Sequence, residues 1–313
     1  IYFSNNNMRS RLIIIVFSAL FIFSTELLSR DVPFTILHFS DSHSYLLGTG
    51  KKNNNLEYSL GGLSRVATVI TNTRSTDTNV MVFHSGDVFT GDFFFNRYFS
   101  APEFTILSRL QLDAIAVGNH EFDLGPQVFY NAVKKGFEGN NIPLLSANLD
   151  LNGFPLLNEF IYPYIIKDYN GVRVGTFGLT YPDPSSNPFP VIISDSILQK
   201  ASLTVQTLYS QNCDVIVCLS HLGFSFDNAL ASIIPGIHII LGGHDHLITY
   251  QPAFVENPAG FNTIICHPGK HYKFVGKLKF VFSNGNVIFQ NYTPIEIKSD
   301  IPHDQRIKDY INS

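Results

Sequence analysis

The stretch VGNHEFDLG, residues 117–125, places an amide, an imidazole and two carboxylates within five positions between two glycines. It follows directly on the largely apolar run 112–116, which is typical of a buried strand. A solvated turn would explain such a cluster, and so would a site that binds metal and moves protons. The choice depends on whether other strands of the chain end in groups of the same kind.

The composition is that of a folded protein with a large core. Hydrophobic residues make up 45% of the 313 positions, and charged residues make up only 15%. The net charge of −4 provides no basic field, so we expect no nucleic-acid partner. Three cysteines cannot form a disulfide framework, and we interpret Cys213 and Cys218, which flank a predicted strand, as core residues.

The N-terminal residues have the pattern of an export signal. Arg9 and Arg11 precede the apolar run Leu12–Phe23, and a candidate cleavage site follows near Ser29. The run is shorter than the about 20 apolar residues of a membrane-spanning helix. We therefore expect residues 1–29 to be a signal peptide and the protein to be secreted or periplasmic, touching a membrane only if the signal stays uncleaved. The alternative is a buried N-terminal helix.

Apolar, β-branched runs alternate with helical patterns, which predicts an α/β fold. Buried strands are predicted at Phe34–Phe39, Val80–Phe83, Ala114–Val117, Leu144–Leu145, Val215–Leu219 and Ile237–Leu241. Helices are predicted at Leu63–Arg74, Pro102–Leu110, Gln127–Lys135, Ile197–Tyr209, Ala229–Ile234 and His303–Ile311. Asn-Gly turns at 170–171 and 284–285 predict two hairpins, so we expect mixed sheets. The polar run 51–55 and the Pro- and Ser-rich stretch 181–190 are interpreted as loops.

Five of the predicted strands end in groups that bind metals. In chain order the groups are Asp41 and His43, Asp87, Asn119 with His120 and Asp123, His221, and His244 with His246. Ligands bind outside the carboxyl ends of strands in α/β sheets, so these residues can converge. Carboxylate, imidazole and amide donors suit zinc, manganese or iron. In the Asp-x-His and His-x-His pairs, we expect an extended segment to point both side chains the same way.

Each motif is weak alone, but five in a row after five strands are poorly explained by solvated turns. We interpret His38, His84 and His238 as core histidines, because they lie in or beside apolar strands. His267, His271 and Lys270 are candidates for touching a substrate. The aromatic run 93–99 predicts either helix and core packing or an apolar surface patch.

This ordered series resembles the calcineurin-like metallophosphoesterase superfamily. More narrowly, it is similar to the catalytic domain of the 5′-nucleotidase and UDP-sugar hydrolase family. The similarity covers residues from about 34 to about 311. It includes the spacers GGLSRVATVI (61–70), LSANL (145–149), GIHIILGGHDH (236–246) and HPGKHYKFVGKL (267–278).

The resemblance implies a four-layer α/β metallophosphoesterase fold, with two packed mixed β-sheets flanked by helices. We expect the catalytic domain at 30–300 and the start of a linker helix at 301–313, without the C-terminal nucleotide-binding domain of the relatives. Residues 1–7 precede Met8. They are either the first residues of the signal peptide or residues that do not belong to the natural protein.

The resemblance also implies two divalent metal ions, zinc, manganese or iron. By motif position the first would be held by Asp41, His43, Asp87 and His246, and the second by Asp87, Asn119, His221 and His244. His120 would be catalytic and oriented by Asp123. The implied reaction is hydrolysis of a small-molecule phosphoester, a nucleotide in a 5′-nucleotidase, by attack of a metal-activated water while His120 assists the leaving group.

Other functions stay open at this point. They are a UDP-sugar hydrolase, a 2′,3′-cyclic-nucleotide phosphodiesterase, a thioester-type hydrolase and a non-catalytic secreted metal-binding module. Glu121 has no ligand role in the implied scheme. It is either a hydrogen-bonding residue behind the site or a solvated one.

Overall fold

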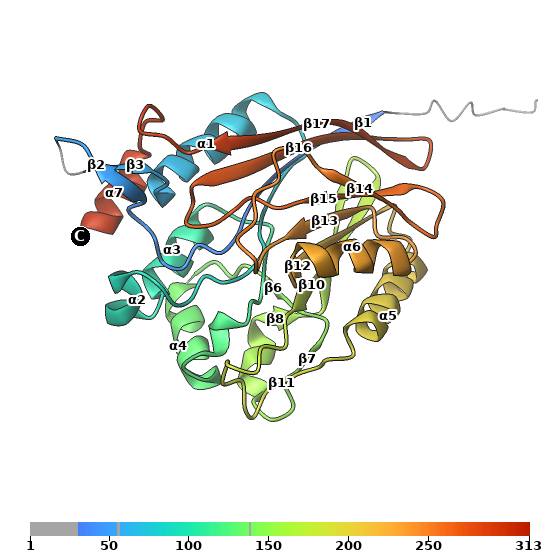
Figure 1. Ribbon diagram of the computed structural model, residues 1–313, viewed down its shortest axis with the longest axis horizontal. Helices are drawn as coiled ribbons and strands as arrows, with labels where there is room; N and C mark the ends of the chain where they lie inside the picture. Colours follow the sequence, from blue (N-terminus) through green and yellow to red (C-terminus); the bar gives the residue numbers. More distant parts are fainter. Residues whose placement is uncertain (1–30, 55–56, 138) are drawn as a thin grey trace, which may run out of the picture.

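The computed structural model describes residues 31–54, 57–137 and 139–313, and Figure 1 shows their arrangement. The expected signal peptide, residues 1–29, lies outside the described residues. Two large β-sheets pack against each other, and helices cover their outer faces (Figure 1). This is the four-layer α/β arrangement expected from the sequence.

The larger sheet has seven strands and is mixed. Its order is β17 (Asn286–Glu296), β16 (Phe274–Ser283), β1 (Val32–Phe39), β4 (Val80–His84), β5 (Ala114–Ala116), β6 (Leu144–Leu145) and β8 (Ile161–Tyr162). Strands β1, β4, β5, β6 and β8 are parallel. Strand β16 runs antiparallel to β1 and forms the predicted hairpin with β17.

The smaller sheet has six strands. Its order is β14 (Ala253–Glu256), β15 (Asn262–Cys266), β13 (Ile239–Gly242), β12 (Val215–His221), β10 (Val172–Thr180) and β9 (Tyr164–Tyr169). The predicted hairpin of β9 and β10 is confirmed. Two short ladders complete the strands, β2 (Thr49–Lys52) with β3 (Tyr58–Leu60) and β7 (Leu149–Asp150) with β11 (Ile192–Ile193).

The helices agree with the sequence pattern in position. They are α1 (Leu63–Thr76), α2 (Phe93–Tyr98), α3 (Ala101–Arg109), α4 (Pro126–Gly136), α5 (Ile197–Ser210), α6 (Phe224–Ile233) and α7 (Gln305–Asn312), with short 3₁₀ turns η1 (His120–Phe122) and η2 (Pro155–Glu159). Two expectations were wrong in extent. Helix α6 begins five residues before Ala229, and the polar run 51–55 is not all loop, because Lys51 and Lys52 belong to β2.

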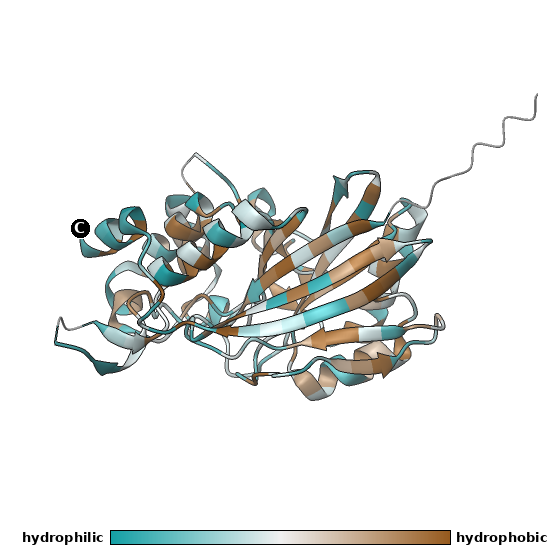
Figure 2. Ribbon diagram, turned by 90° about the horizontal axis from the view of Figure 1, so that it is seen from above, coloured by the Kyte–Doolittle hydropathy of each residue, from teal (hydrophilic) through white to brown (hydrophobic). Residues whose placement is uncertain are grey.

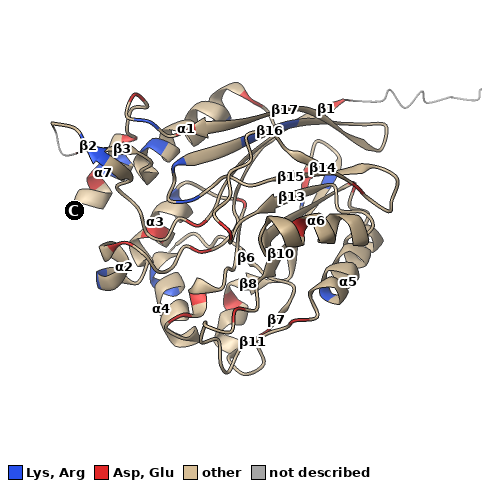
Figure 3. Ribbon diagram, in the orientation of Figure 1, with Lys and Arg blue, Asp and Glu red and all other residues tan. Residues whose placement is uncertain are grey.

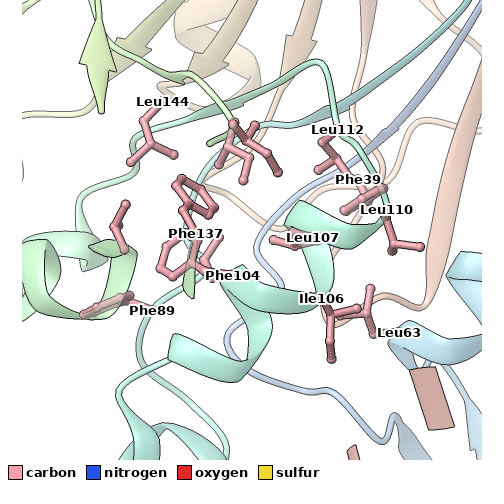
Figure 4. Close-up of a cluster of buried hydrophobic side chains, with 14 of the residues drawn as sticks. Phe39, Leu63, Phe89, Phe104, Ile106, Leu107, Leu110, Leu112, Phe137 and Leu144 are labelled. Atoms are coloured by element: carbon pink, nitrogen blue, oxygen red, sulfur yellow. The ribbon is translucent and has the colours of Figure 1, made fainter. Parts of the chain in front are cut away.

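Alternation along the strands builds three apolar layers. In β1, Phe34 and Ile36 face the second sheet, whereas Leu37 and Phe39 face the helices. The central layer lies between the sheets, whose strands carry many brown, hydrophobic segments in Figure 2. A second layer lies under α1, α3 and α4, and Figure 4 shows part of it, including Phe104 of α3. The third layer lies under α5 and α6. Side chains of both sheets therefore fix how the sheets sit on each other.

Three smaller expectations can be settled from burial. His38, His84 and His238 are buried, as are all three cysteines. The aromatic run 93–99 contributes both to the core and to the surface: Phe95 is buried, while Phe93 and two further aromatic residues are exposed.

Among residues 31–54, 57–137 and 139–313, no helix is both long and apolar enough to cross a membrane.

Candidate metal centre and active site

The carboxyl ends of five parallel strands, three from one sheet and two from the other, meet at one end of the sandwich. The backbone N–H of Asp41, after β1, donates to the carbonyl of Gly86, after β4 (2.9 Å). The backbone N–H of His244, after β13, donates to Oδ1 of Asp41 (3.0 Å). These bonds join loops that follow strands of different sheets. In Figure 3, acidic segments lie in the loops at the centre of the molecule.

One compact group of donor atoms contains Asp41, His43 and His246. Nδ1 of His43 donates to the carbonyl of Phe89 (2.9 Å), so a neutral ring keeps the lone pair on Nε2. That Nε2 lies 3.1 Å from Nε2 of His246, which is itself 3.7 Å from Oδ1 of Asp41. These are three of the four residues predicted for the first metal.

A second compact group contains Asp41, Asp87 and His221. Nδ1 of His221 donates to the carbonyl of Ser85 (2.7 Å), so its Nε2 is directed at the site. Nε2 lies 3.0 Å from Oδ2 of Asp87, but it makes no hydrogen bond, although it is fully buried. Buried polar atoms normally have a hydrogen-bond partner, so a buried imidazole nitrogen that has none and lies beside a carboxylate is well suited to bind a metal ion. The residues present therefore fit a divalent metal ion.

Asn119 and His244 lie beside this second group. Oδ1 of Asn119 is 3.1 Å from Nδ1 of His244, and Nδ2 of Asn119 donates to Asp183 (3.0 Å). The ring of Tyr181 stacks on His244 with a centroid distance of 4.4 Å. Tyr181 and Asp183 belong to the loop 181–190, and sequence reasoning missed both, because a Pro- and Ser-rich loop has no pattern that points to a site.

The expectation that each motif pair lies on an extended segment was wrong. Asp41 and His43 both have a φ of 49°, and His244 and His246 have φ values of 81° and 60°. Asp87 is also left-handed, with a φ of 59°. Residues other than glycine avoid this region, and such strain is typical of functional sites. The paired side chains converge through sharp turns rather than through the alternation of a strand.

Burial and neighbouring charges act in opposite directions on the two carboxylates. Burial raises the pKa of Asp41 to about 6. Burial also acts to raise the pKa of Asp87, but the contacts with His221 outweigh it and hold that pKa below the usual range for aspartate. Asp87 lies near three imidazoles, since its Oδ2 is 3.9 Å from His43 and 4.0 Å from His120. Asp87 is thus the carboxylate at the centre of these three rings.

His120 lies at the open side of the cluster, with a side chain that is 36% exposed. Its Nδ1 donates to Oδ2 of Asp123 (2.7 Å), and the same oxygen accepts from the hydroxyl of Thr90 (2.7 Å). The hydrogen bond to Asp123 raises the pKa of His120 to about 9, although burial opposes the shift. The ring is thus held by one nitrogen, and its Nε2 faces the metal-ligand cluster.

Glu121 has a defined place, in agreement with the first of its two interpretations. It is buried, and each carboxylate oxygen accepts two backbone N–H groups. Oε1 accepts from Val88 (2.7 Å) and Phe89 (3.1 Å), and Oε2 accepts from Gly118 (2.6 Å) and Asp87 (3.2 Å). Glu121 therefore ties the turn after β4 to the turn after β5.

Two glycines permit this close approach. A Cβ atom on Gly118 would lie 2.2 Å from Oδ1 of Asp87, and a Cβ on Gly86 would lie 2.6 Å from Nδ1 of His221. Gly86 also has a φ of 96°, which side chains rarely adopt. A side chain at either position would displace a predicted ligand.

The three residues considered for substrate contact lie in different places. Nζ of Lys270 donates to Nδ1 of His246 (2.9 Å), so Lys270 is at the site. His271 is half-buried and stacks on Tyr45, with ring centroids 3.8 Å apart. His267 is fully buried behind the site, between two carboxylates.

With this geometry, comparison with known proteins identifies the family. The calcineurin-like phosphoesterase profile matches residues 34–247, a range that includes every predicted metal ligand. The chain therefore belongs to the calcineurin-like phosphoesterase family.

Curated relatives and a solved structure narrow the comparison. The 5′-nucleotidase of Diplobatis ommata is 31% identical over 297 residues, covering 88% of this chain and 51% of the relative. The 5′-nucleotidase of Bos taurus is 31% identical over 306 residues, covering 91% of this chain and 53% of the relative. The crystal structure of a 5′-nucleotidase precursor from Thermus thermophilus matches with a TM-score of 0.82 at 29% identity, over 90% of this chain and 58% of that one. The chain spans about half the length of the curated 5′-nucleotidases it matches.

Proposed function

We propose that this chain is the catalytic domain of a dinuclear-metal hydrolase that cleaves phosphoester bonds of nucleotides, as a 5′-nucleotidase does. Family membership and the names of the relatives support phosphoester hydrolysis and a nucleotide substrate. The observation that carries the proposal is the meeting of metal-binding side chains from five strand ends beside the half-exposed pair His120 and Asp123.

The proposal gives the predicted ligands to two cations. Asp41, His43 and His246 would hold one, and His221, Asn119 and His244 would hold the other, with Asp87 between them. Divalent ions at such a site polarise phosphoryl oxygens and lower the pKa of bound water. The residues supply only oxygen and nitrogen donors, which suit zinc, manganese or iron.

The side chains around the ions have separate tasks in this proposal. Asp123 fixes the ring of His120 through Nδ1 and raises the pKa of His120 to about 9, so the ring is protonated on both nitrogens near neutral pH and Nε2 also carries a proton, towards the reacting phosphoester. The Thr90 hydroxyl fixes the Asp123 carboxylate in turn. His120 then donates the proton to the leaving oxygen, or stabilises its developing charge as a cation.

Substrate hydrolysis by purified protein tests the proposal. We would measure metal content and then turnover of AMP, UDP-glucose, 2′,3′-cyclic AMP and bis-p-nitrophenyl phosphate, with Mn²⁺ or Zn²⁺ supplied. Release of phosphate from AMP at the highest kcat/KM is the expected result. A higher kcat/KM for UDP-glucose would identify a UDP-sugar hydrolase instead, and a higher kcat/KM for 2′,3′-cyclic AMP would identify a cyclic-nucleotide phosphodiesterase. Bound metal without turnover of any substrate would support the non-catalytic metal-binding module instead.

We also propose that the protein is exported, because Arg9 and Arg11 precede the apolar run Leu12–Phe23. Expression of the chain in a secreting host, followed by N-terminal sequencing of the product, tests this. A mature N-terminus near Ser29 is the expected result, and an intact N-terminus in the cytosolic fraction would contradict it.

A further inference from the structure

A buried histidine that is not among the predicted ligands lies between two carboxylates. Nε2 of His267 donates to Oδ2 of Asp227 (2.8 Å), and Nδ1 lies 3.3 Å from Oδ1 of Asp245. The second contact is an ion pair rather than a hydrogen bond. Burial lowers the pKa of His267, but the two carboxylates outweigh it and raise the pKa to about 9. Each ring nitrogen thus faces a carboxylate oxygen, an arrangement that favours a proton on both nitrogens.

Each carboxylate is joined to a different part of the metal centre. Asp245 lies in the chain between His244 and His246. Its carboxylate also accepts from the backbone N–H groups of Phe224 (2.7 Å) and Leu247 (3.2 Å).

The other carboxylate leads to the end of β12. Asp227 of α6 is fully buried and accepts a hydrogen bond from the hydroxyl of Ser220. Ser220 is followed directly by the predicted ligand His221. His267 thus connects the end of β12, through α6, with the turn after β13.

His267 also lies against the backbone of that turn. A Cβ atom on Gly242 would be 1.9 Å from Nε2 of His267, so only a glycine leaves room for the ring. The turn needs such support, because His244 and His246 both have left-handed φ values. A residue other than glycine is strained in this region and persists there only where the surroundings fix it.

We propose that His267 is a positioning residue for the metal centre, a buried cation that clamps the turn 242–246 to the end of β12 through Asp245 and Asp227. The clamp holds His221, His244 and His246 where they bind metal. This inference rests on the metal-binding role given to those three residues by the proposed function. His267 acts on metal affinity and takes no part in proton transfer to the substrate.

The variant His267→Gln tests the clamp. Glutamine keeps a donor for one carboxylate but removes the charge between the two. We would measure the Kd for Mn²⁺ and for Zn²⁺ by chelator competition, and we expect it to rise by about 10-fold or more, as for partners behind metal ligands elsewhere. Saturating Mn²⁺ should restore kcat, because the residues that act on the substrate are unchanged.

A matched control separates the clamp from the loss of any buried histidine. His238 is also buried and directly precedes β13 in the smaller sheet. Its Nδ1 accepts a hydrogen bond from the backbone N–H of Ile216 in β12 (3.0 Å). His238→Gln should leave the metal Kd within about 2-fold of the unaltered protein, since the control contacts no predicted ligand. Melting temperatures of both variants after EDTA treatment show whether each is folded.

A second variant keeps the test decisive if His267→Gln does not fold. Asp245→Asn changes a partly exposed side chain and leaves the buried pair of His267 and Asp227 in place. It should also weaken Mn²⁺ binding. An unchanged Kd in either folded variant, or a loss equal to that of His238→Gln, would overturn the clamp. Metal binding without hydrolysis by the unaltered protein would instead refute the proposed function, while the Kd comparison would still test the clamp.

Discussion

Replacing Glu121 by glutamine removes one acceptor oxygen and puts an NH₂ group in front of two backbone N–H groups. Each carboxylate oxygen accepts from two such groups, Oε1 from Val88 and Phe89 and Oε2 from Gly118 and Asp87. Either orientation of the glutamine amide therefore keeps two of the four hydrogen bonds. The other two N–H groups would be buried and would face a donor.

The size of the effect follows from this count. Each buried N–H without an acceptor costs about 1–3 kcal/mol, so Glu121→Gln should lower the free energy of unfolding by about 2–6 kcal/mol. That is a large part of the about 5–15 kcal/mol that stabilises a typical protein. Metal affinity should fall as well, because one of the four groups belongs to Asp87.

Urea unfolding of the EDTA-treated protein, followed by circular dichroism, measures the change. Glu256→Gln is the matched control, since Glu256 is an exposed residue of β14, and it should shift the free energy by less than about 0.5 kcal/mol. A loss below about 1 kcal/mol for Glu121→Gln would refute the reasoning, because the two lost hydrogen bonds would then contribute little.

Three further predictions concern the reaction, the metals and the surface. His120→Asn should lower kcat by about 100-fold or more while metal content by mass spectrometry stays unchanged, and a nearly normal rate would contradict its role. EDTA should abolish turnover and lower the melting temperature, and Mn²⁺ should restore both, since an ion that binds only the folded chain stabilises it. Burial acts to raise the pKa of Asp77, but hydrogen bonds from Lys279 and Lys277 outweigh it and hold the pKa below the usual range for aspartate. The stability advantage over Asp77→Asn should therefore be present in full above about pH 4 and be lost as the pH falls further, which urea unfolding at several pH values can check.

The sequence predicted the strands well because each apolar run is buried on both faces. In β12, Val215 and Val217 pack between the sheets while Ile216 packs under the helices. The run Val215–Val217 is therefore apolar at every position, which makes the strand easy to recognise in the sequence. The start of α6 was missed for the opposite reason. It contains Asp227, whose partners Ser220 and His267 are remote in the sequence.

The meeting of the motif loops followed from the sequence, whereas their backbone geometry did not. Motif order pointed to loops that meet in the structure, but it could not show that Asp41 and His43 lie in left-handed turns. Such turns are fixed by contacts between loops, as between the N–H of Asp41 and the carbonyl of Gly86. For the same reason Asp183 was missed and Glu121 was left between two interpretations, since a lone carboxylate in a sequence does not reveal what it accepts.

The pairing of β1 with β16 has a consequence for how the chain is made. All the predicted ligands lie between residues 41 and 246, yet in the part of the chain that the structure describes one edge of β1 is covered only by β16, residues 274–283. A nascent chain that has emerged as far as His246 therefore holds every ligand and still exposes an unpaired strand edge, which invites aggregation. Metal binding at the complete centre should therefore depend on a hairpin, β16 with β17, that supplies no predicted ligand.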